Sequence, residues 1–429
     1  MSFARDAAAH PYRPPYVIPA PEPERMPGRL VLGLAFAQFG IMLSLLTPMM
    51  VTLALRVAQI VPAAERGAAL GQVLSLGAIL AMLANPVFGA LSDRTTGRLG
   101  RRRPWLIGGA AVALLGLVIV GLADSVQVLM LGWAVAQLGG NAALTAVTAC
   151  VPDLVPEGQR ALISGTVGMM TSIAIVTGTF VADLFEANLI MAFAVPGVTG
   201  LMGAVWLAVV MKDRPAQRGA FGRYGVREFL RSYWVNPRKH PDFARNFVGR
   251  FLVFTGISCV TSYQVYFLMD RLGYAPGEVA EKLSLATVAM VAAVVVGSLL
   301  GGAVSDSTGR RKPFVLFSSL VIAVGLALVA TAHSYLAFAA ALMVFGFGEG
   351  LYLSVDVALA VEVLPNPEES AKDMGVLNIG NALPQSLVPI IAPTLLAIGG
   401  GGNYGALFLF GGIACVLGAV ATQLIRSVK

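Results

Sequence analysis

The chain has 429 residues, of which 57% are hydrophobic and only 12% are charged. A soluble protein carries about 25% charged residues, so this composition excludes a soluble globular protein and indicates a polytopic membrane protein. The net charge of +7 does not indicate nucleic-acid binding, because nearly all Lys and Arg lie in the tails and in loops on one side of the apolar segments.

Residues 1–28 are polar and rich in proline, and we interpret them as a disordered cytoplasmic tail without a cleavable signal. Twelve apolar segments follow, each close to the ~20 residues that a ~30 Å hydrocarbon layer requires. The predicted spans are 30–54, 68–91, 105–123, 126–151, 161–182, 189–211, 248–269, 283–304, 314–332, 335–362, 374–397 and 404–425. An even number of spans puts both termini on one side, and the Arg-rich loops make that side the cytoplasm of a plasma-membrane protein.

The longest internal connection, 212–246, is basic and contains Pro and Gly. It divides the predicted spans into a first bundle, 29–211, and a second bundle, 247–429. Within the connection, apolar residues at 226, 229, 230, 233 and 234 follow a helical spacing, which favours a helix lying on the membrane surface. A loop packed against the bundle is the alternative.

The loop between the second and third spans reads GALSDRTTGRLGRRRPW from Gly89, and a related loop, GAVSDSTGRRKPF, begins at Gly302. The closing prolines of the two loops are 209 residues apart, and the same offset relates Asp153 to Glu362 at the ends of later spans. Two halves with one layout predict an all-α membrane protein with twelve transmembrane helices in two pseudo-symmetric six-helix bundles.

The first loop resembles the loop 2–3 motif of the major facilitator superfamily. Together with FGIMLSLLTP at 39–48 and GVLN at 375–378, it is similar to the glycoside–pentoside–hexuronide symporters and the sucrose transporters. The resemblance implies the major facilitator fold, alternating access, and a gate in which Asp93 pairs with an arginine of its own loop. The positions that match the motif are Gly89, Asp93, Arg94, Arg98, Gly100, Arg101, Arg102, Asp306, Arg310 and Arg311. The same charges also suit a simple topological anchor.

The tenth span contains Glu349, Tyr352 and Asp356 at i, i+3 and i+7, which places them on one helix face. An ionised carboxylate inside a membrane costs at least ~2.5–3.5 kcal/mol unless it is paired, wetted or protonated. No Lys or Arg lies in the middle of a predicted span, so we expect no permanent ion-pair partner for these acids. We therefore predict that Glu349 and Asp356 couple transport to a proton or another cation. A protonated acid hydrogen-bonded between helices is the alternative.

Amide and hydroxyl side chains form stripes on several other spans, as a cavity that binds a polyol would need. The predicted substrate-binding residues are Gln38, Gln137, Asn141, Gln264, Tyr352, Asn378, Asn381 and Gln385. Hydrogen bonding between helices would explain the same residues.

The acids that bind the coupling cation in the two sugar-transporter groups are missing. Ala81 and Asn85 occupy the positions of the sodium-site acids, and Gln137 occupies that of the sucrose-transporter acid. Coupling has therefore moved to Glu349 or Asp356, or the protein is an uncoupled facilitator.

The predicted function is a monomeric, proton-coupled transporter of a sugar or glycoside, with the substrate, protons and the lipid bilayer as its partners. The alternatives are an exporter of a drug-like or cationic metabolite and a non-transporting assembly factor. No nucleophile–base or metal-ligand spacing occurs, so we expect neither an enzyme nor a cofactor, and Cys150, Cys259 and Cys415 are expected to be free thiols.

Overall fold

The structure is a computed structural model that describes residues 26–156, 159–213, 236–308, 310–364 and 370–426. The predicted tail and the predicted surface helix at 226–234 lie outside these residues. The side chains of Asp306 and Asn378 also lie outside the described part.

Twelve helical segments are long and apolar enough to cross a membrane, and every ordered element in the described ranges is helical. The first span consists of α1 (Gly28–Thr47), a π-helical turn η1 (Pro48–Thr52) and α2 (Leu53–Ile60). The rest of the first half is η2 (Ala63–Glu65), α3 (Arg66–Asp93), α4 (Arg103–Leu122), α5 (Val126–Leu154), α6 (Arg160–Leu184) and α7 (Leu189–Val210). The second half is α9 (Pro241–Tyr266) with a π-helical turn η4 (Phe267–Arg271), then α10 (Pro276–Thr308), α11 (Lys312–Thr331), α12 (Tyr335–Glu362), α13 (Ser370–Ala397) and α14 (Tyr404–Gln423).

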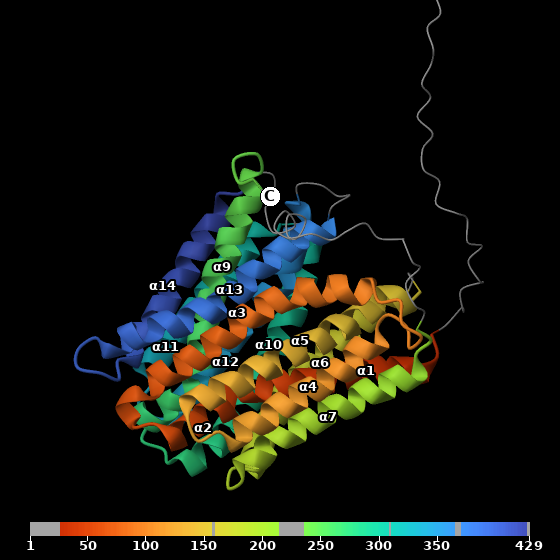
Figure 1. The fold of residues 1–429 in the computed structure, drawn as a ribbon. Helices are drawn as coiled ribbons and strands as arrows, with labels where there is room; N and C mark the ends of the chain where they lie inside the picture. Colours follow the sequence, from red (N-terminus) through yellow and green to blue (C-terminus); the bar gives the residue numbers. More distant parts are fainter. Residues whose placement is uncertain (1–25, 157–158, 214–235, 309, 365–369, 427–429) are drawn as a thin grey trace, which may run out of the picture.

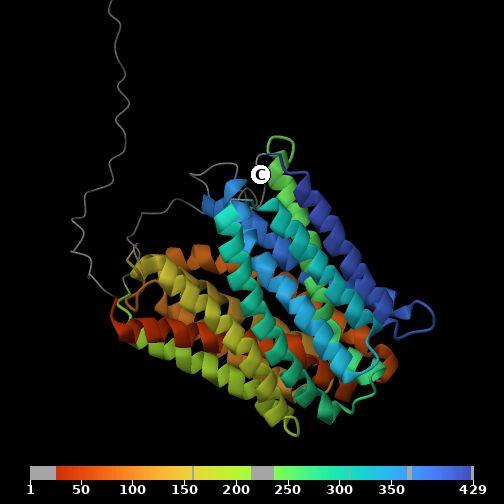
Figure 2. The same cartoon turned by 180° about the vertical axis from the view of Figure 1, so that it is seen from behind.

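The helices pack as two six-helix bundles with the same internal arrangement (Figures 1 and 2). In the first bundle α4 packs on α5 and α1 on α7, and in the second α11 packs on α12 and α9 on α14. Small residues set these crossings: a Cβ atom on Gly109 of α4 would lie 2.7 Å from the carbonyl oxygen of Gly139 on α5. The predicted fold class and the twelve spans are confirmed.

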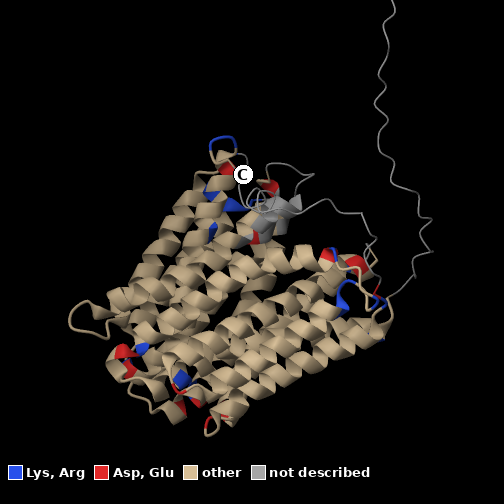
Figure 3. Cartoon of the chain, viewed as in Figure 1, with Lys and Arg blue, Asp and Glu red and all other residues tan. Residues whose placement is uncertain are grey.

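Charged side chains gather at the two ends of the bundles, and the middle of the helices is almost free of them in the described part of the chain (Figure 3). We call one end of the molecule the basic end: it carries the loop 94–102 and the ends of the described chain at 26 and 426. We call the other end the opposite end: it carries the turns near residues 62, 124, 187, 273, 333 and 400.

The bundles meet at the opposite end and separate toward the basic end (Figures 1 and 2). Helix α3 packs against α13 of the second bundle, so the burial of its side chains shows where along the helix the two bundles are in contact. Most side chains between Ala69 and Gly77 are buried, whereas Leu83, Val87 and Leu91 are exposed. The structure is therefore closed at the opposite end and open at the basic end.

Candidate functional site

A cavity of about 160 Å³ lies between the two bundles, where α1, α3 and α5 face α9 and α13. Its polar lining comes from Gln137 and Asn141 of α5, Ser262 of α9 and Gln385 of α13. Its apolar lining is Met42, Leu45, Leu46, Met49, Leu74, Ala78, Ala81, Trp133, Leu144 and Ala382. The cavity thus offers an apolar wall crossed by amides and one hydroxyl.

Gln137 and Asn141 orient each other on the cavity wall. They lie one helical turn apart, and the Asn141 side-chain amide donates to the Gln137 Oε1 atom over 2.8 Å. The same amide also donates to the Gln137 backbone carbonyl over 2.8 Å. Neither the Gln137 NH2 group nor the Asn141 Oδ1 atom has a partner among the described residues. A donor and an acceptor held side by side suit a hydroxyl group of a solute.

Four other predicted substrate-binding residues that the structure describes do not line this cavity: Gln38, Gln264, Tyr352 and Asn381. The Gln38 amide donates to the Thr171 hydroxyl over 3.5 Å, and the Gln264 Nε2 atom is buried without a partner in the described ranges. Tyr352 and Asn381 belong to a buried network on the side of α9 that faces α12 and α13. Of the eight predicted residues, Gln137, Asn141 and Gln385 line the cavity.

Asp356 has an ion-pair partner that the sequence analysis did not expect. The Arg250 Nη2 atom lies 3.0 Å from the Asp356 Oδ2 atom, and both side chains are buried. The Tyr352 hydroxyl donates to Asp356 Oδ1 over 3.0 Å, and the Arg250 Nε atom donates to Asn381. The expectation of no basic partner is wrong because α9 begins at Pro241, seven residues before the predicted span, which puts Arg250 well inside the helix.

Glu349 lies in the middle of α12, near half the depth of the bundle. Its side chain is half-buried and has no hydrogen-bond or ion-pair partner among the described residues. Two acids on one face of α12 therefore differ: Asp356 pairs with Arg250, and Glu349 has no partner in the part of the chain that the structure describes.

The opposite end of the cavity is closed by hydrogen bonds between the bundles. The Tyr266 hydroxyl on α9 donates to the Ala54 carbonyl oxygen over 3.1 Å, and the Tyr263 hydroxyl lies 3.3 Å from the Gly67 carbonyl oxygen. Gly71 of α3 approaches α13 so closely that a Cβ atom would lie 2.2 Å from the Pro389 carbonyl oxygen. Sequence reasoning missed this seal because its acceptors are backbone atoms.

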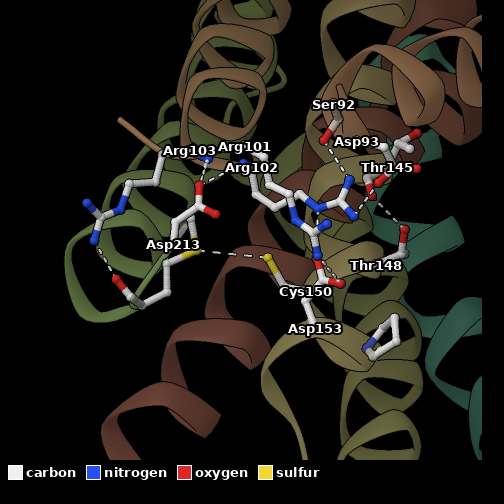
Figure 4. Close-up of polar contacts among 12 residues, drawn as sticks. Ser92, Asp93, Arg101, Arg102, Arg103, Thr145, Thr148, Cys150, Asp153 and Asp213 are labelled. Carbon is white, nitrogen blue, oxygen red and sulfur yellow. Dashed lines mark hydrogen bonds and ion pairs between the residues drawn. The ribbon is translucent and has the colours of Figure 1, made fainter. Parts of the chain in front are cut away.

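At the basic end, Arg102 is the centre of a cluster within the first bundle (Figure 4). Its guanidinium lies 2.5 Å from Asp93 and 2.9 Å from Asp153, and it donates to the Ser92 hydroxyl over 2.7 Å. Arg101 also pairs with Asp153, at 2.6 Å. Burial alone would lower the pKa of the Arg102 guanidinium, but the hydrogen bonds and charges of Asp153 and Asp93 outweigh it and raise that pKa above its ordinary value. The cluster ties the ends of α3 and α5 to the loop between α3 and α4.

Asp213, which follows α7, holds the other side of the loop (Figure 4). Its Oδ2 atom accepts from the backbone N–H groups of Arg102 and Arg103 over 2.7 and 2.9 Å, so it satisfies donors at the start of α4. Gly100 has a φ of +96°, and a Cβ atom there would overlap Asp213. Sequence reasoning also missed Asp213, whose only signal is an acid directly after the sixth span.

The second bundle repeats the cluster. Arg311, which corresponds to Arg102 at the 209 offset, donates to the Ser305 hydroxyl over 2.8 Å and lies 3.5 Å from Glu362. Lys312 donates to the Ile425 carbonyl oxygen, as Arg103 does to that of Met211. The described contacts of both clusters stay within their own bundle.

The remaining motif positions contribute less to these clusters. The Arg94 guanidinium donates to the Ala90 carbonyl oxygen over 2.9 Å. Gly89 lies beside Thr145 of α5, and Arg98 and Arg310 are exposed.

Comparisons with known proteins agree with this architecture. The family model of the Major Facilitator Superfamily matches residues 30–280 and 246–429. The chain is similar to Multidrug resistance protein 2 of Bacillus subtilis, with 23% identity over 371 residues, covering 85% of this chain and 88% of that protein.

Two solved structures share the fold. The nucleoside transporter NupG superposes with a TM-score of 0.72 at 16% identity, covering 94% of this chain and 100% of that one. A D-xylose–proton symporter superposes with a TM-score of 0.72 at 15% identity, covering 93% and 97%. From the family match and the twelve apolar helices, the chain belongs to the Major Facilitator Superfamily and is a multi-pass membrane transporter.

Proposed function

We propose that this transporter moves a small neutral polyol, such as a sugar or glycoside, by alternating access and in symport with protons. The observation that carries the substrate class is the pair of amides on the cavity wall. Gln137 and Asn141 present a free donor and a free acceptor beside the Trp133 side chain, and Gln385 lines the cavity from the other bundle. Sugar hydroxyl groups can form hydrogen bonds with the amides, and the apolar face of a sugar ring can pack against the indole.

The proposed topology makes the basic end cytoplasmic, with both termini inside the cell and the protein in the plasma membrane. The positive-inside rule supports this assignment, since the Arg-rich loops lie at the basic end. The structure would then be an inward-open state, sealed outside by Tyr263 and Tyr266.

Glu349 is the proposed proton carrier. An acid at mid-membrane depth without a basic partner is more stable when protonated, and it exchanges its proton when the surroundings become wet. Asp356 is the weaker candidate, because the neighbouring Arg250 guanidinium stabilises its ionised form. We assign Asp356 to the support of α9 and α12.

The test is proton flux in proteoliposomes that hold the purified protein as a monomer. We expect a sugar gradient to drive a pH change that Glu349→Gln abolishes, while sugar counterflow continues at a comparable rate. Glu281→Gln is the matched control, because Glu281 is an exposed acid at the opposite end, and it should behave as the unsubstituted protein. A sugar-driven pH change that persists in Glu349→Gln would show that Glu349 does not carry the proton.

A second candidate function is the export of an apolar or cationic compound. Ten of the fourteen lining residues are apolar and two of them are Met42 and Met49, whose flexible side chains adapt to varied ligands. The similarity to a multidrug resistance protein also favours it. Lipophilic cations that drive proton flux where sugars do not would select this function. Gln137→Ala should weaken sugar transport more than cation transport, with the exposed Gln72→Ala as control.

A further inference from the structure

A second hollow lies on the outside of the first bundle, separate from the cavity between the bundles. It measures about 330 Å³ and is formed where α3 and α4 both pack on α5. Its lining is Phe88, Pro104, Trp105, Gly108, Gly109, Val112, Leu138, Gly139 and Ala142. We call this hollow the α3–α4–α5 groove. Every lining residue is apolar, as expected of a surface that meets lipid chains.

The groove exists because position 108 is glycine. Gly108 is exposed, and a Cβ atom added to it would meet no other atom within 4 Å. In the second bundle the residue at the 209 offset is Phe317, whose side chain is 55% exposed. The two halves therefore differ at this position, with an aromatic ring on α11 and open space on α4.

The basic end of the groove has an ordered aromatic wall, and the loop that lies against this wall contains an exposed cation. The Trp105 indole donates to the Thr95 hydroxyl over 2.8 Å, and its ring centroid lies 5.5 Å from that of Phe88. Arg98, three residues beyond Thr95, is exposed and has no hydrogen-bond or ion-pair partner among the described residues. Tryptophan and arginine in this order are typical of the membrane interface, where lipid headgroups begin.

The length of the groove matches one lipid leaflet. From Pro104 to Val112 it follows eight residues of α4, which is about 12 Å at 1.5 Å per residue. A leaflet has a hydrocarbon depth of about 15 Å. A chain that enters beside Trp105 therefore runs from the headgroup region almost to the middle of the membrane.

We propose that the α3–α4–α5 groove binds one acyl chain of an anionic phospholipid whose phosphate contacts Arg98. The apolar lining would accept the chain, and the exposed Arg98 guanidinium, in the loop that Trp105 contacts through Thr95, would select a negatively charged headgroup. The bound lipid would fill the space that Phe317 fills in the other half. This site is independent of the transported solute and of the proton carrier.

The test is native mass spectrometry of the detergent-purified protein with added phosphatidylglycerol or phosphatidylcholine. We expect one retained lipid, with phosphatidylglycerol preferred about fivefold, the effect of one basic residue near a membrane surface. Gly108→Phe, which introduces the residue of the other half, should abolish retention of either lipid. Arg98→Gln should keep a bound lipid and lose the fivefold preference.

Two matched controls are available. Leu122→Phe adds a ring to an exposed position at the far end of α4, ten residues beyond Val112, and Arg238→Gln removes an exposed cation at the basic end of the other bundle. Both should retain lipid as the unsubstituted protein does. If Gly108→Phe does not fold, Gly108→Leu serves the same purpose. Retention of phosphatidylglycerol by a folded Gly108 variant, or equal retention of the two lipids by the unsubstituted protein, would overturn the proposal.

Discussion

Arg250 of α9 and Asp356 of α12 form an ion pair of 3.0 Å in which the two residues are only 5% and 2% exposed. Such a pair offsets the cost of burying either charge, so removing one partner leaves an uncompensated charge inside the bundle. The pair also accounts for two predicted site residues, since Tyr352 donates to Asp356 and Asn381 accepts from Arg250.

Removing one member of this pair should destabilise the protein strongly. We expect Arg250→Gln or Asp356→Asn to lower the free energy of unfolding by about 3–5 kcal/mol, and the double variant to recover much of that loss. Thermal unfolding in detergent measures this. Glu281→Gln, in an exposed pair of 3.8 Å, should change stability by less than about 1 kcal/mol. Additive losses in the double variant would show that the two charges do not stabilise each other.

Gly71→Val should prevent closure of the opposite end. Any β-carbon at position 71 would lie 2.2 Å from the Pro389 carbonyl oxygen, so the bundles would have to separate there. A cysteine introduced at Ser75, which is buried one turn further along α3, reports this change through its reaction with a maleimide. We expect labelling at least about tenfold faster, a shift of about 1.4 kcal/mol in the conformational equilibrium.

The control for this experiment is Gly168→Val in α6, where a Cβ atom would meet nothing within 4 Å. It should leave the labelling rate of the cysteine at position 75 unchanged. Equal rates in the Gly71 and Gly168 variants would mean that the close approach of α3 and α13 does not keep this end closed.

Gly100→Ala should loosen the loop at the basic end. The backbone φ of +96° is unfavourable for alanine, and its Cβ atom would overlap the Asp213 carboxylate that caps α4. We expect a loss of about 1–3 kcal/mol in the free energy of unfolding. Gly97→Ala, in the same loop, has its nearest contact at 4.0 Å and should be nearly neutral. Thermal unfolding of the two variants side by side measures this difference, and equal stability of the two would contradict the prediction.

Glu186, in the turn after α6, should make stability depend on pH. Burial, followed by the charges of Asp183 and Glu278, raises the pKa of its carboxyl above the ordinary 4.5. The folded protein therefore holds this proton more tightly than the unfolded chain, and stability falls as the pH rises from below 4.5 through the raised pKa.

Glu186→Gln should remove the decrease in stability that the Glu186 carboxyl causes as the pH rises. Between about pH 4 and about pH 7, we expect the unfolding temperature of the unsubstituted protein to decline relative to that of the variant. Glu65→Gln, at an exposed acid of the same end, is the control. A constant difference between the two unfolding temperatures across this range would contradict the prediction.

The spans and their pairing into two halves were predictable because they depend on apolar length and on repeated charged loops. The start of α9 was not predictable, because Asp242, Arg245 and Asn246 make its first turns polar. The predicted span therefore began at 248 and placed Arg250 at the edge of the membrane. The role of Asp213 requires knowing that α7 ends beside the start of α4. Which amides meet in one cavity depends on helix rotation, which polar stripes alone do not determine.

The seal at the opposite end joins side chains of one bundle to the backbone of the other. Tyr266 donates to the carbonyl oxygen of Ala54, and every amino acid supplies that acceptor. Substitutions at position 54 can thus accumulate over evolution without loss of the hydrogen bond, whereas loss of the tyrosine hydroxyl removes it at once. Comparison of orthologous sequences should accordingly find position 54 variable and position 266 fixed as tyrosine.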